Sequence, residues 1–203
     1  MIAGNLFIIS AASGAGKTSL VKALLAQDAG LKLSVSHTTR APRPGEENGV
    51  HYHFVDEAEF MEILAQDGFL ESAHVHGARY GTSQRGVNET LASGQDVILE
   101  IDWQGAEQVR RLYLQAISIF ILPPSMAVLA QRLTSRGQDS QEVIDKRLAA
   151  ARSEMANLGS YDYVTINADF ETALQDIQAI MRAARLKTAA QVARHAALIQ
   201  SLT

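Results

Sequence analysis

Residues 10–19 read S-A-A-S-G-A-G-K-T-S, and they lie between the apolar run L-F-I-I at 6–9 and apolar residues at helical spacing over 20–25. A buried strand, a glycine-rich turn, a Lys-Thr pair and a helix in this order form a phosphate cradle. Backbone N–H groups and the helix N-terminus face the anion, and Lys17 adds a positive charge. The stretch therefore predicts a nucleoside triphosphate site of the P-loop type.

The P-loop pattern G-x-x-x-x-G-K-[S/T] is incomplete, because Ala11 occupies the position of the first glycine. Gly14 and Gly16 remain to supply positive φ, so Ala11 is compatible with the pattern if its own φ is negative. The Thr18 hydroxyl stands where Mg²⁺ is usually held. The residues predicted to surround the nucleotide phosphates are Ala11, Ala12, Ser13, Gly14, Ala15, Gly16, Lys17, Thr18 and Ser19.

Composition narrows the range of partners. The chain has 203 residues, 47% of them hydrophobic, which is enough for one substantial core. Its 18 Lys and Arg residues against 22 Asp and Glu residues leave no global field that favours duplex nucleic acid. Cysteine is absent, no signal-peptide pattern opens the sequence, and no apolar run reaches about 18 residues. We therefore expect a cytoplasmic protein that binds small molecules, without a nucleic-acid or membrane partner.

Apolar strand candidates alternate with helical patterns along the chain. The candidates are residues 6–10, 33–36, 97–101, 117–122 and 163–166. Parallel strands need crossover connections, so this alternation predicts an α/β fold with a doubly wound, mostly parallel sheet covered on both faces. Ligands of such folds bind beyond the carboxyl ends of the strands, where the P-loop falls.

Three stretches depart from this alternation. Residues 38–92 contain turns and short alternating runs, which predict a small, partly antiparallel inserted sheet with one helix near 57–66. Residues 132–152 form a polar interruption between two helical patterns. Residues 170–202 predict one long amphipathic helix. Solvation and the helix dipole account for its basic residues, Arg182, Arg185, Lys187 and Arg194.

An acidic residue follows the central strand in V-I-L-E-I-D-W at 97–103. An apolar strand that ends in a carboxylate is the Walker B arrangement, which places Asp102 where it holds Mg²⁺ through water or contacts a nucleotide. A simple helix cap is the alternative reading of Asp102. The upstream P-loop favours the functional one.

A second anion site is predicted in the proline-stiffened loop that carries Arg40 and Arg43. Two guanidinium groups, with Tyr52 and Tyr80 as phenol donors, form a receptor for a dianion such as a monophosphate. A GTPase has no need of this receptor, so the pattern favours a kinase that acts on a small phosphorylated acceptor. A solvated basic loop is the alternative.

With these motifs in place, the sequence resembles guanylate kinases over nearly its whole length. The T-T-R-x-P-R-x-G-E run is the most specific signal, because few other P-loop families carry it. The stretches that carry the resemblance are S-G-A-G-K-T at 13–18, S-H-T-T-R-A-P-R-P-G-E at 36–46, H-Y-H-F at 51–54, Y-G-T at 80–82, I-D-W-Q-G at 101–105 and R-G-Q-D-S at 136–140.

The resemblance implies a P-loop nucleoside-monophosphate kinase that catalyses ATP + GMP = ADP + GDP with Mg²⁺, in purine nucleotide metabolism. It implies one domain with three parts: a core of 1–35, 97–127 and 160–203, a GMP-binding segment of 36–96, and a lid of 128–159. On the GMP side, the matching positions are Arg40, Arg43, Tyr52 and Tyr80 for the phosphate, Ser36, Glu71 and Thr82 for guanine, Glu100 and Asp102 as acidic contacts, and Glu46 to steady the arginines. On the ATP side, they are Lys17, Thr18 as the Mg²⁺ ligand, Asn167, and the lid arginines Arg132, Arg136 and Arg147.

Glu71 has a physical reason to read guanine. Guanine presents its N1–H and 2-amino donors side by side, and one carboxylate accepts from both, whereas adenine has no N1 proton and no 2-amino group. An unpaired buried carboxylate is expensive, so the site should reject AMP. The phosphate oxygen of GMP is already anionic and needs no general base, so catalysis reduces to alignment and charge neutralisation by groups such as Lys17 and Arg43.

Three departures from the usual family pattern bear on affinity. They are Ala11 for glycine, Glu100 for aspartate, and Ala168 in N-A-D, where N-D-D is more usual. The alternatives are a scaffold domain that keeps the fold without catalysis and a kinase of another nucleoside monophosphate. The presence of Lys17, Thr18, Arg136 and Arg147 argues against the scaffold. The tolerance for dGMP and a homo-oligomeric state stay open.

Overall fold

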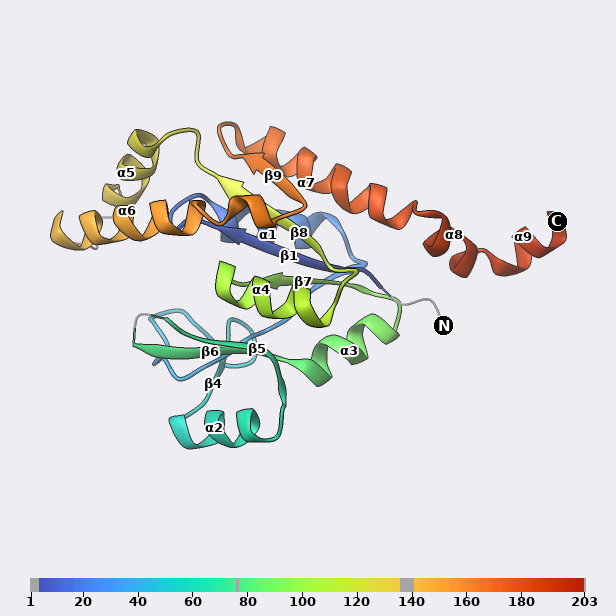
Figure 1. Ribbon diagram of the computed structural model, residues 1–203, viewed down its shortest axis with the longest axis horizontal. Coiled ribbons are helices and arrows are strands. Elements are labelled where there is room, and N and C mark those ends of the chain that lie inside the picture. Colours follow the sequence, from blue (N-terminus) through green and yellow to red (C-terminus); the bar gives the residue numbers. More distant parts are fainter. Residues whose placement is uncertain (1–3, 76, 136–140, 203) are drawn as a thin grey trace.

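A computed structural model of the chain describes residues 4–75, 77–135 and 141–202. Within these residues the main sheet has five strands, and all neighbours in it run parallel. Their spatial order is β2 (Leu31–Leu33), β7 (Asp96–Glu100), β1 (Leu6–Ala11), β8 (Ile117–Leu122) and β9 (Tyr163–Ile166). Neighbouring strands are distant in the sequence because parallel pairing needs crossover connections. The doubly wound α/β class is confirmed (Figure 1).

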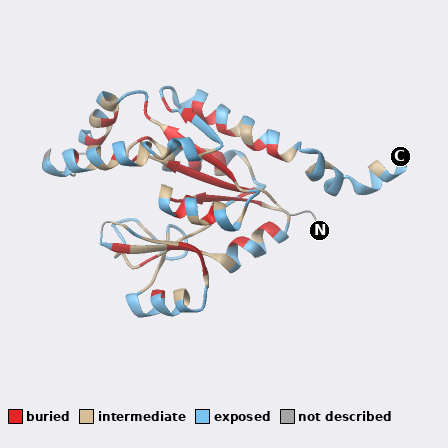
Figure 2. Ribbon diagram, viewed as in Figure 1, coloured by how far each residue is buried: buried red, intermediate tan, exposed pale blue. Residues whose placement is uncertain are grey.

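Helices cover both faces of this sheet: α1 (Lys17–Gln27) and α7 (Phe170–Arg185) on one, α3 (Gln84–Ala92) and α4 (Trp103–Leu112) on the other. Successive side chains of a strand point to opposite faces, so the continuous apolar run of β1 serves both layers. Phe7 and Ile9 pack with α1 and α7, while Leu6 and Ile8 pack with α3 and α4. The buried strands lie at the centre of the molecule in Figure 2.

A second sheet is inserted between β2 and α3. Its strands, in spatial order, are β4 (His53–Phe54), β3 (His37–Thr38), β6 (Ala78–Ser83) and β5 (Phe69–Val75). The pairs β3–β6 and β5–β6 are antiparallel, whereas β3–β4 is parallel. Helix α2 (Glu57–Ala65) packs on it through Phe60, whose ring centroid lies 4.5 Å from that of Phe69. The predicted partly antiparallel inserted sheet and its helix near 57–66 are confirmed, but the stretch 38–92 also contains α3, which was not predicted.

The stretch 132–152 is not simply a polar interruption, because much of it is helical. Helix α5 (Met126–Thr134) extends into its first residues, and α6 (Gln141–Met155) occupies its second half. Ile144, Leu148 and Ala151 recur at helical spacing, so α6 has an apolar face that packs on α5 and on Ala12 of the P-loop. The short helix η1 (Leu158–Ser160) then leads to β9.

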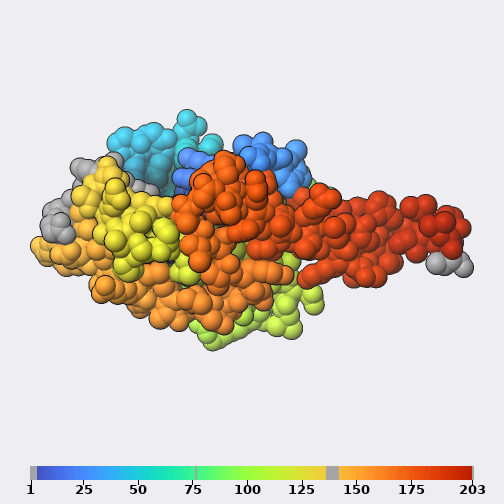
Figure 3. Space-filling view, turned by 90° about the horizontal axis from the view of Figure 1, so that it is seen from above, coloured from blue at the N-terminus to red at the C-terminus, as the bar shows by residue number. Residues whose placement is uncertain are grey.

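The C-terminal stretch is not the single long helix that its periodicity predicts. It divides into α7, α8 (Thr188–Arg194) and α9 (Ala196–Leu202). Ala184 in α7 is packed in the core, and α8 and α9 contain no buried residues. A helix is only marginally stable without packing, and no buried contact holds this segment in line with α7. Figure 3 shows this segment projecting from the body of the molecule. None of the helices in the described ranges has the length and apolar content needed to cross a membrane.

Strand boundaries and one basic residue also differ from expectation. Strand β2 ends at Leu33, short of the predicted 33–36, because the chain leaves the main sheet there to begin β3. Strand β7 lies one residue earlier than 97–101. Arg185 is not merely solvated: its guanidinium bonds Asp28 at 2.7 Å and Asp96 at 2.6 Å.

Candidate active site

The P-loop joins β1 to α1 with the geometry that an anion site needs. Gly14 and Gly16 have φ of 91° and 100°, and Asp67 is the one non-glycine residue with positive φ in the described ranges. Ala11, the last residue of β1, therefore meets the condition set from its sequence. Helix α1 begins after Gly16 without a side-chain cap, so its first N–H groups are not satisfied by a capping side chain.

Lys17 and Thr18 face acidic residues at the end of β7. The Lys17 ammonium donates to the Ile101 carbonyl oxygen at 3.3 Å. Burial lowers the pKa of Lys17, and this effect exceeds the opposing attraction of Glu100, Asp102 and Glu154. The Thr18 hydroxyl donates to Glu100 Oε1 at 2.6 Å.

Asp102 is a helix cap, and it also faces the predicted nucleotide site. Its carboxylate caps α4 by accepting from the Gly105 N–H at 2.9 Å, and it also lines the cavity above the P-loop. With Thr18 and Glu100 it forms a set of oxygen donors, which is the ligand chemistry that Mg²⁺ prefers. The residues present therefore fit this ion.

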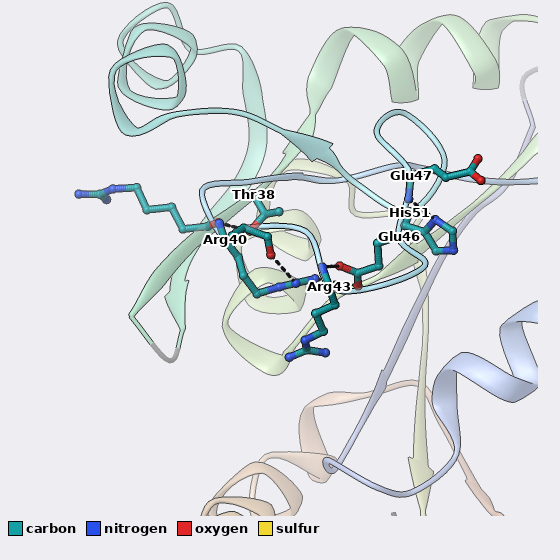
Figure 4. Close-up of polar contacts among 8 residues, drawn as sticks. Thr38, Arg40, Arg43, Glu46, Glu47 and His51 are labelled. Atoms are coloured by element: carbon teal, nitrogen blue, oxygen red, sulfur yellow. Dashed lines mark hydrogen bonds and ion pairs between the residues drawn. The ribbon is translucent and has the colours of Figure 1, made fainter. Parts of the chain in front are cut away.

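The loop between β3 and β4 carries the predicted second anion site, shown in Figure 4. Arg40 Nη2 lies 2.9 Å from Glu46 Oε1, and Glu46 Oε2 accepts from the Arg43 backbone N–H at 2.7 Å. The hydrogen bond from Arg40 holds the pKa of Glu46 below its ordinary value. Glu46 thus ties the two arginine positions together. The Arg43 side chain itself extends away from this pair (Figure 4).

Two tyrosine rings lie beside Arg40, Tyr52 from the same loop and Tyr80 from β6. The centroids of Tyr52 and Tyr80 lie 5.9 Å apart in an edge-on arrangement, and the Arg40 guanidinium is 5.4 Å from the Tyr52 centroid. Burial raises the pKa of Tyr52, so its phenol keeps its proton at neutral pH and can donate to an anion. The structure therefore brings Arg40, Tyr52 and Tyr80 together.

A cavity of about 160 Å³ opens beside the two tyrosines. It contains six of the residues predicted to bind the acceptor, and its lining is Ser36, Tyr52, Glu71, Ala73, Val75, Tyr80, Glu100, Ile101 and Asp102. Thr82, also predicted to touch the acceptor, is fully buried, and its hydroxyl donates to Glu71 Oε1 at 2.6 Å. Thr82 thus orients Glu71 in this structure.

Glu71 is the most deeply buried acid of this cavity. Glu71 is 4% exposed, and burial raises its pKa to about 7 despite the hydrogen bond from Thr82. Gly105 makes this placement possible, because a Cβ there would lie 2.6 Å from Glu71 Oε2. Sequence reasoning assigned no role to Gly105, although it lies in the I-D-W-Q-G stretch.

A second cavity, of about 350 Å³, extends over the P-loop. Tyr52, Tyr80 and Asp102 line both cavities. The space above the phosphate cradle is therefore adjacent to the space around Glu71. A donor and an acceptor bound in the two would meet at these three side chains.

Comparisons with known proteins identify the family of this chain. The family model described as guanylate kinase matches residues 3–184. The chain belongs to the guanylate kinase family. The guanylate kinase of Methylobacillus flagellatus is 66% identical over 98% of this chain and 98% of its own, and that of Dechloromonas aromatica is 57% identical over 99% and 100%. A crystal structure of guanylate kinase from Anaplasma phagocytophilum has a TM-score of 0.77 and 34% identity, and the match covers 92% of this chain and 88% of that one.

Two of the three arginines that were predicted to act from a lid contact the P-loop. Arg147 Nη2 donates to Ser13 Oγ at 2.9 Å. Arg132 donates to the Ala15 carbonyl at 3.3 Å and to the Asn167 carbonyl at 2.9 Å. Arg136 lies outside the described residues. The predicted contacts of all three with a transferring phosphoryl group stay predictions.

Asn167 is hydrogen-bonded to the P-loop of this guanylate kinase. It is 5% exposed, and its Nδ2 donates to the Ala15 carbonyl at 2.8 Å. A Cβ at Gly16 would lie 2.3 Å from that Nδ2, so Gly16 is required by close approach as well as by its φ. The predicted contact of Asn167 with ATP stays a prediction.

Two further residues of the site were missed. Buried Thr38 accepts from the Arg40 N–H at 3.2 Å and donates to the Arg79 carbonyl at 2.9 Å, which fixes the start of the arginine loop. The signal was present in the T-T-R motif. Glu154, which accepts from the Ser13 N–H at 3.1 Å, had no sequence signal, because 141 residues separate the two.

Proposed function

We propose that this guanylate kinase transfers the γ-phosphoryl group of ATP to GMP where its two cavities meet, giving ADP and GDP. The observation that carries the proposal is the shared lining of Tyr52, Tyr80 and Asp102 between the cavity over the P-loop and the cavity around Glu71. Direct transfer needs donor and acceptor oxygens in line and within reach, and adjacent pockets provide this.

Glu71 is the proposed reader of guanine. Its carboxylate lies in the smaller cavity, with one oxygen held by Thr82 and the other against Gly105. The N1–H and 2-amino donors of guanine favour the ionised form of this carboxyl, whose pKa is about 7 in the free protein. Adenine offers no donor pair and leaves the buried charge unpaired. The site therefore selects GMP over AMP.

The phosphate of GMP is assigned to Arg40, Arg43, Tyr52 and Tyr80. Glu46 sets the positions of Arg40 and the Arg43 backbone through bonds of 2.9 and 2.7 Å. Two guanidinium groups and two phenols match the charge and the donor needs of a monophosphate dianion. Ser36, Glu100 and Asp102 complete the acceptor site.

The donor phosphates are assigned to the P-loop N–H groups and Lys17. The Lys17 ammonium lines the cavity over the P-loop and is attracted by the charges of Glu100 and Asp102. Thr18 is the proposed ligand of Mg²⁺, with Asp102 acting through water, and the ion when bound neutralises charge on the β- and γ-phosphates. Arg132, Arg136 and Arg147 are proposed to add positive charge from the lid.

No general base is assigned, because the attacking oxygen of GMP is already anionic at neutral pH. The protein aligns the two nucleotides and neutralises their charge. Lid closure would exclude water, a competing acceptor. Residues 128–159 are the proposed lid, 36–96 the GMP-binding segment, and 1–35, 97–127 and 160–203 the core. Support comes from the second sheet, which lies wholly within 36–96.

The test is ADP release from ATP with GMP, dGMP, AMP or UMP as acceptor. We expect turnover with GMP and at least about 100-fold lower kcat/KM with AMP. Equal turnover of AMP would contradict the role of Glu71. Silence with every acceptor would favour a scaffold function, and the variant Lys17→Ala serves as the inactive control for contaminating kinases.

A further inference from the structure

Glu154 places a carboxylate on the P-loop of this protein. Its Oε2 accepts a hydrogen bond from the Ser13 N–H at 3.1 Å. Ser13 belongs to the loop whose backbone N–H groups bind phosphate in P-loop proteins. A carboxylate oxygen and a phosphate oxygen are both anionic acceptors of a hydrogen bond from an N–H group. Glu154 therefore occupies the Ser13 N–H, which could otherwise donate to a nucleotide phosphate.

The surroundings of this carboxylate are those of the donor site. Glu154 lines the cavity over the P-loop together with Lys17 and Thr18. It is also one of three carboxylates whose charge raises the pKa of Lys17 against the effect of burial. The one ammonium of the cradle thus already has anionic neighbours before any nucleotide arrives.

The structure of α6 fixes Glu154 in this position. Ile144 and Ala151 on its apolar face are buried against α5 and Ala12. Arg147 lies seven residues before Glu154, hence on the same face of the helix, and donates to Ser13 Oγ at 2.9 Å. Two residues of α6 therefore hold Ser13, one through its hydroxyl and one through its N–H.

We infer that Glu154 is an internal occupant of the phosphate cradle, which the terminal phosphates of ATP must displace. A carboxylate beside a polyphosphate is repelled, so the two cannot share the Ser13 N–H and the field of Lys17. Displacement breaks one of the two contacts that hold Ser13 to α6, while the positive charge of Arg147 stays attractive to phosphate. ATP binding thereby changes how the lid helix meets the P-loop. The inference rests on the proposed function, because it takes ATP as the donor.

The direct test compares Glu154→Gln with the wild type. Glutamine keeps the size and an acceptor oxygen but removes the charge. We expect the dissociation constants of ATP and of tripolyphosphate, measured by calorimetry without acceptor, to fall by about five- to fiftyfold. The KM for ATP should fall likewise, while the KM for GMP stays the same. Tripolyphosphate is included because it has no base or sugar, so its binding reports on the cradle alone.

Glu142→Gln is the matched control. It removes the same charge from the same helix at an exposed position paired with Lys146, and it should leave both dissociation constants unchanged. Unchanged or weaker binding of either ligand to Glu154→Gln would overturn the inference, as would equal tightening in the control. A purely structural role of Glu154 predicts a lower thermal midpoint without tighter binding.

A second measurement does not depend on any variant. In a crystal structure of the wild type with an ATP analogue and no acceptor, a phosphate oxygen should replace Glu154 on the Ser13 N–H. An intact Ser13–Glu154 bond beside bound phosphates would contradict the inference. A failure of the proposed function can be told apart from a failure of this inference. If the proposed function is wrong, the wild type does not turn over GMP; if only the inference is wrong, the wild type turns over GMP and Glu154→Gln binds ATP no more tightly.

Discussion

Replacing Glu71 by glutamine should make the protein more stable at high pH and worse at binding GMP. Burial raises the pKa of Glu71 from 4.5 to about 7, so the folded chain retains a proton that the unfolded chain has lost within this window. Where the folded state binds more protons, the free energy of unfolding falls as the pH rises. The change amounts to about 3 kcal/mol between pH 4.5 and 7.

The Glu71→Gln variant lacks this titration. Its amide still accepts the 2.6 Å hydrogen bond from Thr82 through Oε1, but its NH₂ group faces the cavity without an assigned partner. An unsatisfied donor costs about 1–2 kcal/mol at every pH. The variant should therefore be less stable than the wild type near pH 4.5 and more stable by about 1–2 kcal/mol at pH 8.

Urea unfolding of both proteins at pH 4.5, 6 and 8 measures this difference, and steady-state kinetics measures the consequence for function. Guanine loses two charge-assisted bonds in the variant, so the KM for GMP should rise about 10- to 100-fold, while that for ATP stays unchanged. Glu89→Gln, at an exposed ion pair with Arg85, is the control and should show no pH-dependent difference. A stability difference that does not vary with pH, or an equal rise in the KM for ATP, would contradict the burial and the guanine-binding role given to Glu71.

Three further predictions concern single cations. Lys17→Ala should lower kcat by about 10³ or more while CD spectra stay native, since the cradle loses its ammonium; near-normal turnover would refute its assignment. Arg43→Ala should raise the KM for GMP far more than that for ATP, and the reverse would exchange the two sites. Arg185→Leu should lower the free energy of unfolding by about 2–4 kcal/mol in urea, because Asp96, whose side chain is 5% exposed, loses its charged partner while keeping its hydrogen bonds from Asn5. Arg85→Leu removes an arginine whose side chain is 87% exposed, so it should leave the free energy of unfolding nearly unchanged.

Local sequence patterns predicted the parts of the fold that depend on local chemistry. Strands 117–122 and 163–166 have the predicted bounds, because their apolar runs are interrupted at both ends. The P-loop is at its predicted place, with Gly14 and Gly16 at positive φ. The C-terminal helix was predicted too long. The helical pattern of the sequence was extended past Ala184, but beyond that residue α8 has no buried residue packed against the core.

Contacts between distant residues could not be predicted in this way. Arg185 finds Asp28 and Asp96 only after three elements have packed together. Ser36, Tyr52 and Glu71 were predicted from the family resemblance to bind the acceptor, and the structure brings them into one cavity. Glu154 carries no local pattern that marks it, since its role depends on how α6 lies on the P-loop.

We propose that one cavity holds guanine on Glu71, with the GMP phosphate facing the P-loop. A crystal structure with a conjugate of adenosine and guanosine joined through a phosphate chain tests it most directly. We predict the guanine edge on the Glu71 carboxylate and the chain running past Tyr52 and Tyr80 to the Lys17 ammonium. Guanine bound elsewhere, or Arg40 and Arg43 turned to bulk solvent with the chain outside the P-loop, would contradict it.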